Sequence, residues 1–174
     1  MRALVIYESM FGNTETIARE VASGLESAGA EVTVAPVTQA DPDTLADYDV
    51  VVAGAPTHAF SLPRPATRAD AVRQGADPAH AGPGLREWLD RLEPSIGARP
   101  TFAVFDTRMG SSSTARRVTG SASKRAVRTL LRRHRALADH PTSFYVGGTA
   151  GPLLPGEDAR ARAWGRSLVG CRVR

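Results

Sequence analysis

Short apolar runs alternate with segments of helical periodicity along the whole chain, and this alternation limits the possible folds more than any other feature. Runs rich in β-branched residues predict five strands, at Ala3–Tyr7, Glu31–Val37, Asp49–Gly54, Thr101–Phe105 and Thr142–Val146. Apolar residues at helical spacing predict helices at 13–28, 84–92, 121–137 and 156–169, with a short helical piece at 41–47. Each crossover is long enough to return to a parallel neighbour. The pattern therefore predicts a doubly wound α/β fold, with a layer of helices on each face of the sheet.

One long connection interrupts this pattern. From Ala55 to about Gly84 the sequence is rich in proline, glycine and alanine, and we predict no regular structure there. A connection of that length in a compact domain usually has a function or is disordered.

Length and composition indicate an ordinary globular protein. At 174 residues, with 42% hydrophobic and 23% charged residues, the chain is expected to form one domain over residues 1–174, as a monomer or homodimer. It has no apolar run of the roughly 20 residues that span a bilayer and no signal-peptide pattern, so we expect a cytoplasmic protein without a membrane partner. Cys171 is the single cysteine, which excludes an internal disulfide and a cysteine metal site. We expect an ordinary thiol there, and no metal site.

Three loops are the candidates for a binding site. In a doubly wound sheet, ligands bind outside the carboxyl ends of the strands, where the direction of winding switches. The loops that begin at Glu8, Ala55 and Asp106 follow the first, third and fourth predicted strands. These loops are therefore expected to meet at one edge of the sheet.

The first of these loops, Ser9-Met10-Phe11-Gly12-Asn13-Thr14, leads into a helix. The backbone N–H groups at a helix start suit an anion, Gly12 permits close approach, and the hydroxyl and amide side chains add donors. The loop has no lysine, which the nucleoside triphosphate loops require. It therefore predicts a site for a single phosphate, unless Ser9, Asn13 and Thr14 merely cap the helix, with Thr14 or Asn13 as the best cap candidates.

The segments VIYESMFGNTETIA and VVVAGAPTHAF resemble the flavodoxin family and the related flavodoxin-like quinone reductases. The resemblance covers nearly the whole chain, because further segments follow in the order of bacterial flavodoxin-domain proteins: LREWLD, FDTR, GSASKRAV, GPLLPGE and AWG. It implies a five-stranded parallel sheet of order 2-1-3-4-5 in a three-layer α/β/α arrangement. It also implies noncovalent FMN at the switch between the first and third strands, a rule of which flavodoxin itself is a known example.

The same resemblance implies which residues would hold FMN. The first loop, Ser9 to Thr14, would wrap the 5′-phosphate, and Phe11 departs from the family because many members carry a third hydroxyl there. The isoalloxazine ring would lie between two groups of residues: Pro56, Thr57, His58, Ala59 and Phe60 on one side, and Thr107, Arg108, Met109 and Gly110 on the other. No catalytic residue is assigned. The alternatives are that Phe60 packs into the core, that His58 is solvated, and that Arg108 is a surface residue paired with Asp106.

The net charge of +4 comes mostly from arginine, and basic residues gather at the fourth predicted helix and its approach: Arg116, Arg117, Lys124, Arg125, Arg128, Arg132, Arg133 and Arg135. They form either the solvated face of an amphipathic helix or a docking surface for an acidic redox partner. A nucleic-acid surface would interleave aromatic residues, and the helix has none.

Three functions stay open at this stage. The first is an electron carrier that uses FMN between redox partner proteins, which is the prediction we favour. The second is an FMN-dependent NAD(P)H:quinone-type oxidoreductase, which would make the protein an enzyme. The third is a flavodoxin-like module that binds no flavin.

Overall fold

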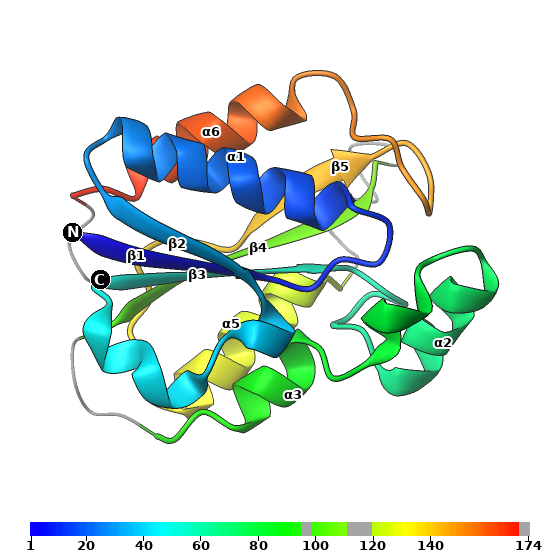
Figure 1. Ribbon diagram of the computed structural model, residues 1–174, viewed down its shortest axis with the longest axis horizontal. Coiled ribbons are helices and arrows are strands. Elements are labelled where there is room, and N and C mark those ends of the chain that lie inside the picture. The colour runs from blue at the N-terminus through cyan, green and yellow to red at the C-terminus, as the bar shows by residue number, and fades with distance from the viewer. Residues whose placement is uncertain (95–98, 111–119, 171–174) are drawn as a thin grey trace.

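The computed structural model describes residues 1–94, 99–110 and 120–170, and a five-stranded parallel sheet lies at its centre (Figure 1). The strands are β1 (Arg2–Tyr7), β2 (Glu31–Pro36), β3 (Val50–Pro56), β4 (Thr101–Met109) and β5 (Thr142–Val146). Their order, β2-β1-β3-β4-β5, confirms the expected doubly wound topology. The switch point between β1 and β3 is where such sheets bind ligands.

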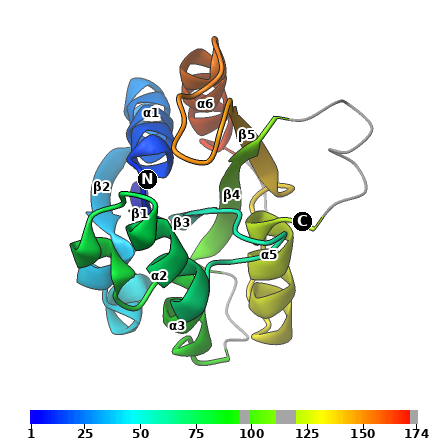
Figure 2. The same ribbon diagram turned by 90° about the vertical axis from the view of Figure 1, so that its right-hand side faces the viewer.

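Helices cover both faces of the sheet. Figure 2, which looks onto the carboxyl ends of the strands, shows α1 (Asn13–Ser27) and α6 (Glu157–Ser167) on one face. The other face carries α3 (Leu85–Asp90) and α5 (Ala122–Arg132), while α2 (Pro65–Arg73) lies beyond the strand ends. Short 3₁₀ turns complete the connections, at Val37–Gln39, Pro42–Asp47 and Pro78–Ala81. The predicted three-layer arrangement is confirmed.

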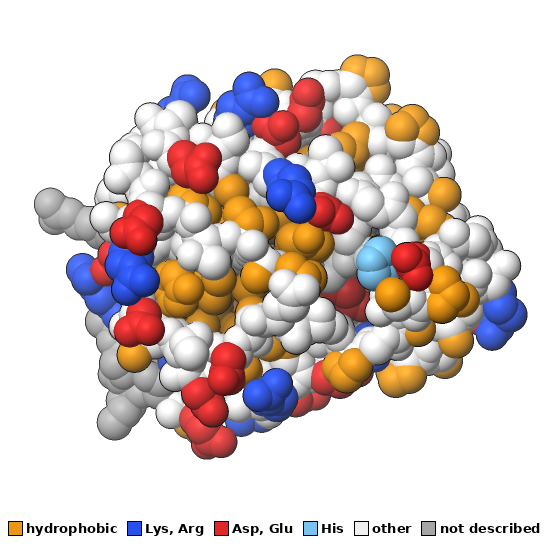
Figure 3. Space-filling model, in the orientation of Figure 1, with side chains coloured by type: hydrophobic (Ala, Val, Ile, Leu, Met, Phe, Trp, Pro, Cys, Tyr) orange, Lys and Arg blue, Asp and Glu red, His pale blue; other side chains and the backbone are white. Residues whose placement is uncertain are grey.

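The central strands are apolar on both sides because both of their faces are covered. Along β1, Leu4 and Ile6 pack into the core beneath α3 and α5, whereas Ala3 and Val5 pack into the core beneath α1 and α6. The strand β2 lies at one edge of the sheet, and none of its residues is fully buried. Figure 3 shows a patch of apolar side chains over this edge, bordered by charged ones. None of the helices in the described part of the chain is long and apolar enough to cross a membrane.

The contact between α1 and α6 depends on two glycines. A Cβ atom at Gly165 would collide with the carbonyl oxygen of Val21, and one at Gly24 would collide with the carbonyl oxygen of Arg162. Both obstacles are helix backbone, which cannot move aside as a flexible side chain would. The two helices therefore pack at a separation that only glycine permits.

The structure corrects several predicted boundaries. The segment from Ala55 to Gly84 was wrongly expected to be irregular, since it contains α2 and a 3₁₀ turn. The loop predicted from Asp106 starts later, because β4 continues to Met109. The helix predicted at 121–137 ends at Arg132, and Leu137 instead forms a bridge to Phe102. Ser111, Arg116, Arg117 and Cys171 lie outside the described residues.

We predict that Gly165→Ala destabilises the fold by about 1–3 kcal/mol, the usual range for an overpacked contact, although alanine has the better helix propensity. Thermal or urea unfolding followed by circular dichroism measures the change. Gly82→Ala is the matched control, because Gly82 has a φ of −63° and open space around its Cβ position. Equal stability of the Gly165→Ala variant and the wild type would contradict the close helix contact.

Candidate functional site

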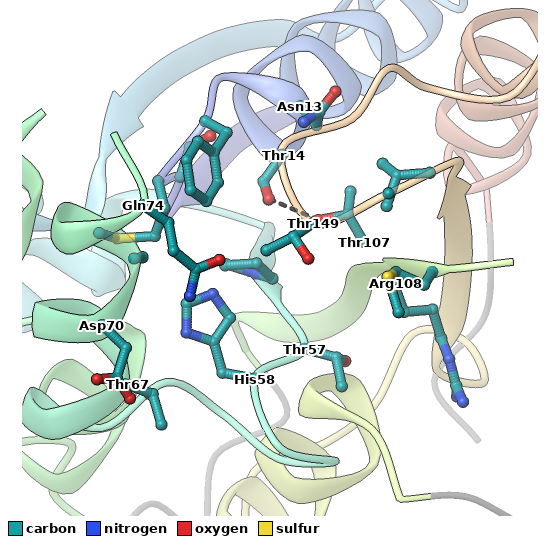
Figure 4. A pocket seen from close by; sticks show the side chains of 18 of the residues that line it. Asn13, Thr14, Thr57, His58, Thr67, Asp70, Gln74, Thr107, Arg108 and Thr149 are labelled. Atoms are coloured by element: carbon teal, nitrogen blue, oxygen red, sulfur yellow. Dashed lines mark hydrogen bonds between the residues drawn. The ribbon is translucent and has the colours of Figure 1, made fainter. Parts of the chain in front are cut away.

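A cavity of about 340 Å³ lies at the carboxyl edge of the sheet (Figure 4). Side chains from the loops after β1, β3 and β4 line it, as the topology predicted. All of the residues predicted for the site line this cavity except Gly12, Phe60 and Gly110. The structure thus brings the three loops together, while their binding of a cofactor stays a prediction.

The first loop enters α1 through Gly12, which is the N-cap residue and has a left-handed φ of 84°. Asn13 and Thr14 are the first two residues of the helix, so neither is its N-cap residue and the capping alternative for them is wrong. The N-cap residue is Gly12, which has no side chain that could cap the helix. Ser9 reaches into the first turn, where its Oγ accepts a hydrogen bond from the Glu15 N–H at 3.3 Å. Asn13 and Thr14 are thus not consumed by capping, whereas the Ser9 oxygen already accepts a hydrogen bond from the first turn of α1.

Asn13 and Thr14 have partners in other loops. The Asn13 amide donates to the Ala150 carbonyl oxygen at 3.0 Å, which joins the first loop to the loop after β5. The hydroxyls of Thr14 and Thr107 lie 2.7 Å apart in a buried hydrogen bond between the first loop and β4. One hydroxyl of that pair donates to the other, and the second keeps its own proton for a ligand.

Phe11 has a structural role that the sequence did not indicate. With Met10 it packs against Ala71, Val72 and Ala76, in and just after α2, in a small apolar cluster separate from the two main cores. Phe11 also lines the cavity. The residue that departs from the family's hydroxyl pattern therefore attaches α2 to the first loop.

A buried ion cluster makes the same connection. Arg68 of α2 is 2% exposed and bonds to Glu8 at the end of β1 at 3.4 Å and to Glu87 of α3 at 3.0 Å. The second carboxylate oxygen of Glu8 accepts a hydrogen bond from the Leu85 N–H at 2.8 Å. A Cβ atom at Gly84 would collide with the Glu8 carboxylate, so glycine is required there.

The two carboxylates of this cluster differ in their electrostatics. Burial raises the pKa of Glu8, and this effect outweighs the hydrogen bond from Leu85 and the charge of Arg68. Burial acts in the same direction on Glu87, but hydrogen bonds from Arg68 and from the Gly84 N–H outweigh it and lower the pKa of Glu87. Glu8 is therefore the carboxylate of the pair whose charged form burial disfavours on balance.

We predict that Arg68→Met destabilises the protein by about 3–5 kcal/mol at pH 7.5, the usual effect of removing one partner of a buried ion pair. A carboxyl whose folded pKa is raised destabilises the fold as pH rises through that pKa. Unfolding in urea at pH 7.5 and pH 5 should therefore show a smaller loss at the lower pH, where Glu8 takes up a proton.

The double variant Glu8→Gln/Arg68→Met is the matched control, since it removes the uncompensated charge. It should be more stable than Arg68→Met at pH 7.5. A loss in Arg68→Met that is the same at both pH values, and equal in the double variant, would contradict a charge effect.

His58 and Phe60 occupy different environments. The His58 ring lines the cavity and Figure 4 shows it beside Gln74 of α2. Burial lowers the pKa of His58 from its ordinary 6.5, so the ring is neutral at pH 7; the Thr67 backbone opposes the shift and Arg68 adds to it. Phe60 is 66% exposed and does not line the cavity, so it does not pack into the core, while its predicted contact with a flavin stays a prediction.

We predict that the fold loses stability between pH 7.5 and pH 5.5 more steeply in the wild type than in His58→Gln. Because the folded pKa of His58 is lowered, the unfolded chain binds the proton more readily, and stability falls as pH drops through the ordinary value of 6.5. Melting temperatures at both pH values test this. His140→Gln, at an exposed position, serves as the control for loss of an imidazole. Parallel pH profiles for wild type and His58→Gln would contradict the prediction.

The third loop follows β4, and Asp106 of that strand is fully buried. Its Oδ2 accepts hydrogen bonds of 3.0 Å from the hydroxyls of Thr57 and Ser123 and from the Ser123 N–H at the start of α5. This carboxylate thus joins the second loop, β4 and α5. Arg108 lines the cavity, but Figure 4 shows its guanidinium pointing away from Thr107 and His58.

Two walls of the cavity were missed in the sequence. One is α2, which contributes Thr67, Asp70, Ala71 and Gln74, and the other is the segment after β5, which contributes Gly148 and Thr149. The signal for α2 was present, because Pro65 stands at the first helical turn and no proline or glycine interrupts 66–73. The proximity of the β5 segment follows only from the Asn13–Ala150 contact.

The residues present fit a phosphate joined to a planar ring. Ser9, Thr14 and the start of α1 offer neutral donors for a phosphate, and no lysine is among the residues that line the cavity. Among the described residues that line the cavity, only Phe11 and His58 carry a ring. The ring site therefore differs from the tryptophan and tyrosine pairs that many flavodoxins are known for.

Comparison with known sequences gives matches in the N-terminal part of the chain. Residues 5–75 match the family model described as Flavodoxin. An NAD(P)H dehydrogenase (quinone) from Rhizobium johnstonii is 40% identical over 76 residues, covering 32% of this chain and 38% of the relative. One of the same name from Rhizobium rhizogenes is 38% identical over 76 residues, with the same coverage. The match spans 38% of the length of these relatives.

Comparison with solved structures covers nearly the whole chain. Oxidised Flavodoxin 2 from Bacillus cereus superposes with a TM-score of 0.67 at 22% identity, covering 97% of this chain and 98% of that one. A flavodoxin from the domain Archaea gives 0.64 at 17% identity, with 97% and 96% coverage. The Flv1 flavodiiron core from Synechocystis gives 0.61 at 16% identity, with 97% and 35% coverage. At these identities the likeness shows the fold, and the match to the flavodoxin family model is confined to residues 5–75.

Proposed function

We propose that the cavity binds FMN noncovalently and that the protein carries electrons between redox partner proteins. The observation that carries the proposal is the meeting of a neutral, hydroxyl-bearing loop at the start of α1 with the loops after β3 and β4 in one cavity. The match of residues 5–75 to the flavodoxin family model supports a flavin as the cofactor, and FMN fits a loop with donors for a single phosphate.

Each loop would have its own task in holding this cofactor. Ser9, Asn13 and Thr14 would bind the phosphate together with the N–H groups at the start of α1. Thr57 and Thr107, on adjacent strand ends, would contact the remainder, and the 2.8 Å bond from the Thr57 N–H to the Thr107 carbonyl fixes their separation. When bound, FMN supplies reversible one- and two-electron transfer.

His58 would face the ring as a neutral imidazole. Its lowered pKa means that it does not place a positive charge beside the ring at pH 7. A neutral imidazole still offers one donor and one acceptor. His58 would therefore orient the ring edge through hydrogen bonding rather than through charge.

A second candidate function is an FMN-dependent NAD(P)H:quinone-type oxidoreductase. The specific observation in its favour is α2, which adds the polar side chains of Thr67, Asp70 and Gln74 to one wall of the cavity. A carrier that exposes its cofactor edge to partner proteins has no need of such a wall. Names of the Rhizobium relatives point the same way. Oxidation of NADPH by the FMN-loaded protein with a soluble quinone would favour this function, and its absence would favour the carrier.

The flavin titration is the decisive test. We predict that the purified protein binds FMN with quenching of flavin fluorescence, and that Thr14→Val binds about 10–100-fold more weakly, the effect of one lost hydrogen bond to a charged group. Valine preserves the shape of threonine, so the loop is retained. Thr33→Val, on the exposed side of the edge strand β2, is the control and should bind FMN as the wild type does.

Two outcomes would contradict this assignment. If Thr14→Val bound FMN as tightly as the wild type does, the assignment of the phosphate to the first loop would be wrong. A protein that neither contains nor binds FMN would exclude both redox functions and leave a flavodoxin-like module without flavin.

A further inference from the structure

The turn after β3 has an unfavourable backbone and exposes an aromatic side chain. His58 and Ser61 exchange two backbone hydrogen bonds of 2.9 and 3.0 Å, which closes a tight two-residue turn around Ala59 and Phe60. Both central residues are left-handed, with φ of 44° and 60°. Such turns are normally made by asparagine and glycine, because a Cβ atom costs about 1–2 kcal/mol per residue in this conformation.

This turn does not gain burial in exchange for its strain. Phe60 is 66% exposed, and Met109 at the end of β4, on the rim of the same cavity, is 57% exposed. The two are among the few large apolar side chains that the described part of the molecule exposes. Strain retained at an exposed aromatic residue points to a function outside the fold.

The start of α5 lies directly against this turn. A Cβ atom at Gly120 would be 2.5 Å from the Phe60 carbonyl oxygen, so the two backbones touch. The Ala122 N–H donates to the Thr57 hydroxyl at 2.9 Å and fixes the helix start to the same loop. Figure 2 shows the loop after β3 running to α5. The exposed phenylalanine is therefore adjacent to the most basic helix of the chain.

Three arginines, which we call the arginine cluster, come from elements near the turn: Arg64 directly precedes α2, Arg86 is in α3 and Arg125 is in α5. Arg86 is held in place by the Pro63 carbonyl at 3.0 Å, the Leu62 carbonyl at 2.7 Å and the Ser61 hydroxyl at 3.3 Å. Burial lowers the pKa of Arg86, and the charges of Arg64 and Arg125 lower it further. Glu87 and Asp90 offset this only in part.

We propose that Phe60, Met109 and the arginine cluster form the docking surface for a redox protein with an acidic face. The assignment rests on the proposed electron-transfer function, and it names the surface and the charge of the partner. An aromatic anchor surrounded by arginines is the composition that protein interfaces favour. Complementary charge would steer the partner to the rim of the cavity and raise the association rate at low salt.

The test measures binding of an acidic plant-type [2Fe–2S] ferredoxin by fluorescence anisotropy, with the protein both free of flavin and loaded with FMN. We expect binding at 20 mM salt that weakens at least about tenfold at 300 mM, because surface charges are screened over the Debye length. Arg64→Glu and Arg125→Glu should each weaken binding by about tenfold or more. Arg166→Glu on α6, on the opposite face of the sheet, makes the same change in net charge and should bind as the wild type does.

Phe60→Gly separates docking from folding. Glycine relieves the left-handed strain, so the variant should melt at the same temperature as the wild type or higher, while its affinity for the ferredoxin falls. A variant that keeps full affinity would overturn the role of Phe60. A variant that unfolds would show that the turn serves the fold, and this would also overturn the proposal.

Other outcomes bear on the charge assignment. If Arg166→Glu lost as much affinity for ferredoxin as the two cluster variants do, the proposed docking surface would be wrong. Tighter binding of basic cytochrome c than of ferredoxin would overturn the acidic partner, as would binding of a single-stranded oligonucleotide by the same arginines in preference to ferredoxin. Binding of ferredoxin by a protein that takes up no FMN would support the surface and contradict the proposed function, so the two failures are distinguishable.

Discussion

The guanidinium of Arg68 is 2% exposed, and a charge at that depth must be neutralised by carboxylates in contact with it. Glu8 at the end of β1 and Glu87 in α3 supply them. Because the three residues belong to separate elements, satisfying this one charge places α2 against the first loop and against α3. The polar wall of the cavity, the position of His58 and the course of residues 57–84 all depend on that placement.

The apolar contact of Phe11 with α2 adds to the ion cluster and explains the composition of the first loop. Its polar half, Ser9, Asn13 and Thr14, faces neighbouring loops and the cavity, while Met10 and Phe11 hold α2. A loop that serves both purposes has fewer hydroxyls than one that only wraps a phosphate. Phe11 provides no hydroxyl, but its contact with α2 places that helix as an additional wall of the cavity.

The predictable part of the site is the part that topology controls. The carboxyl ends of parallel strands lie at one edge, so the loops after β1, β3 and β4 were bound to meet, and most of the residues assigned to them line the cavity. Phe60 does not line the cavity, because it is one of the two central residues of a tight turn that directs its side chain outwards. The wall from α2 and the segment after β5 depend on contacts between residues far apart in sequence, such as Arg68 with Glu8, which no local pattern reports.

The sequence by itself determined the strand and helix alternation, the order of the crossovers through its family resemblance, and a first loop with hydroxyl and amide side chains but no lysine, because these properties follow from local periodicity and residue chemistry. Only the tertiary structure decided that Arg68 is buried, that Asn13 and Thr14 bond to other parts of the chain, and that Phe60 is exposed in the turn after β3. The physical reason is that burial and charge pairing are properties of residues brought together from distant parts of the chain. The burial and bonding of Arg68, Thr14 and Phe60 therefore depend on neighbours that are distant in the sequence.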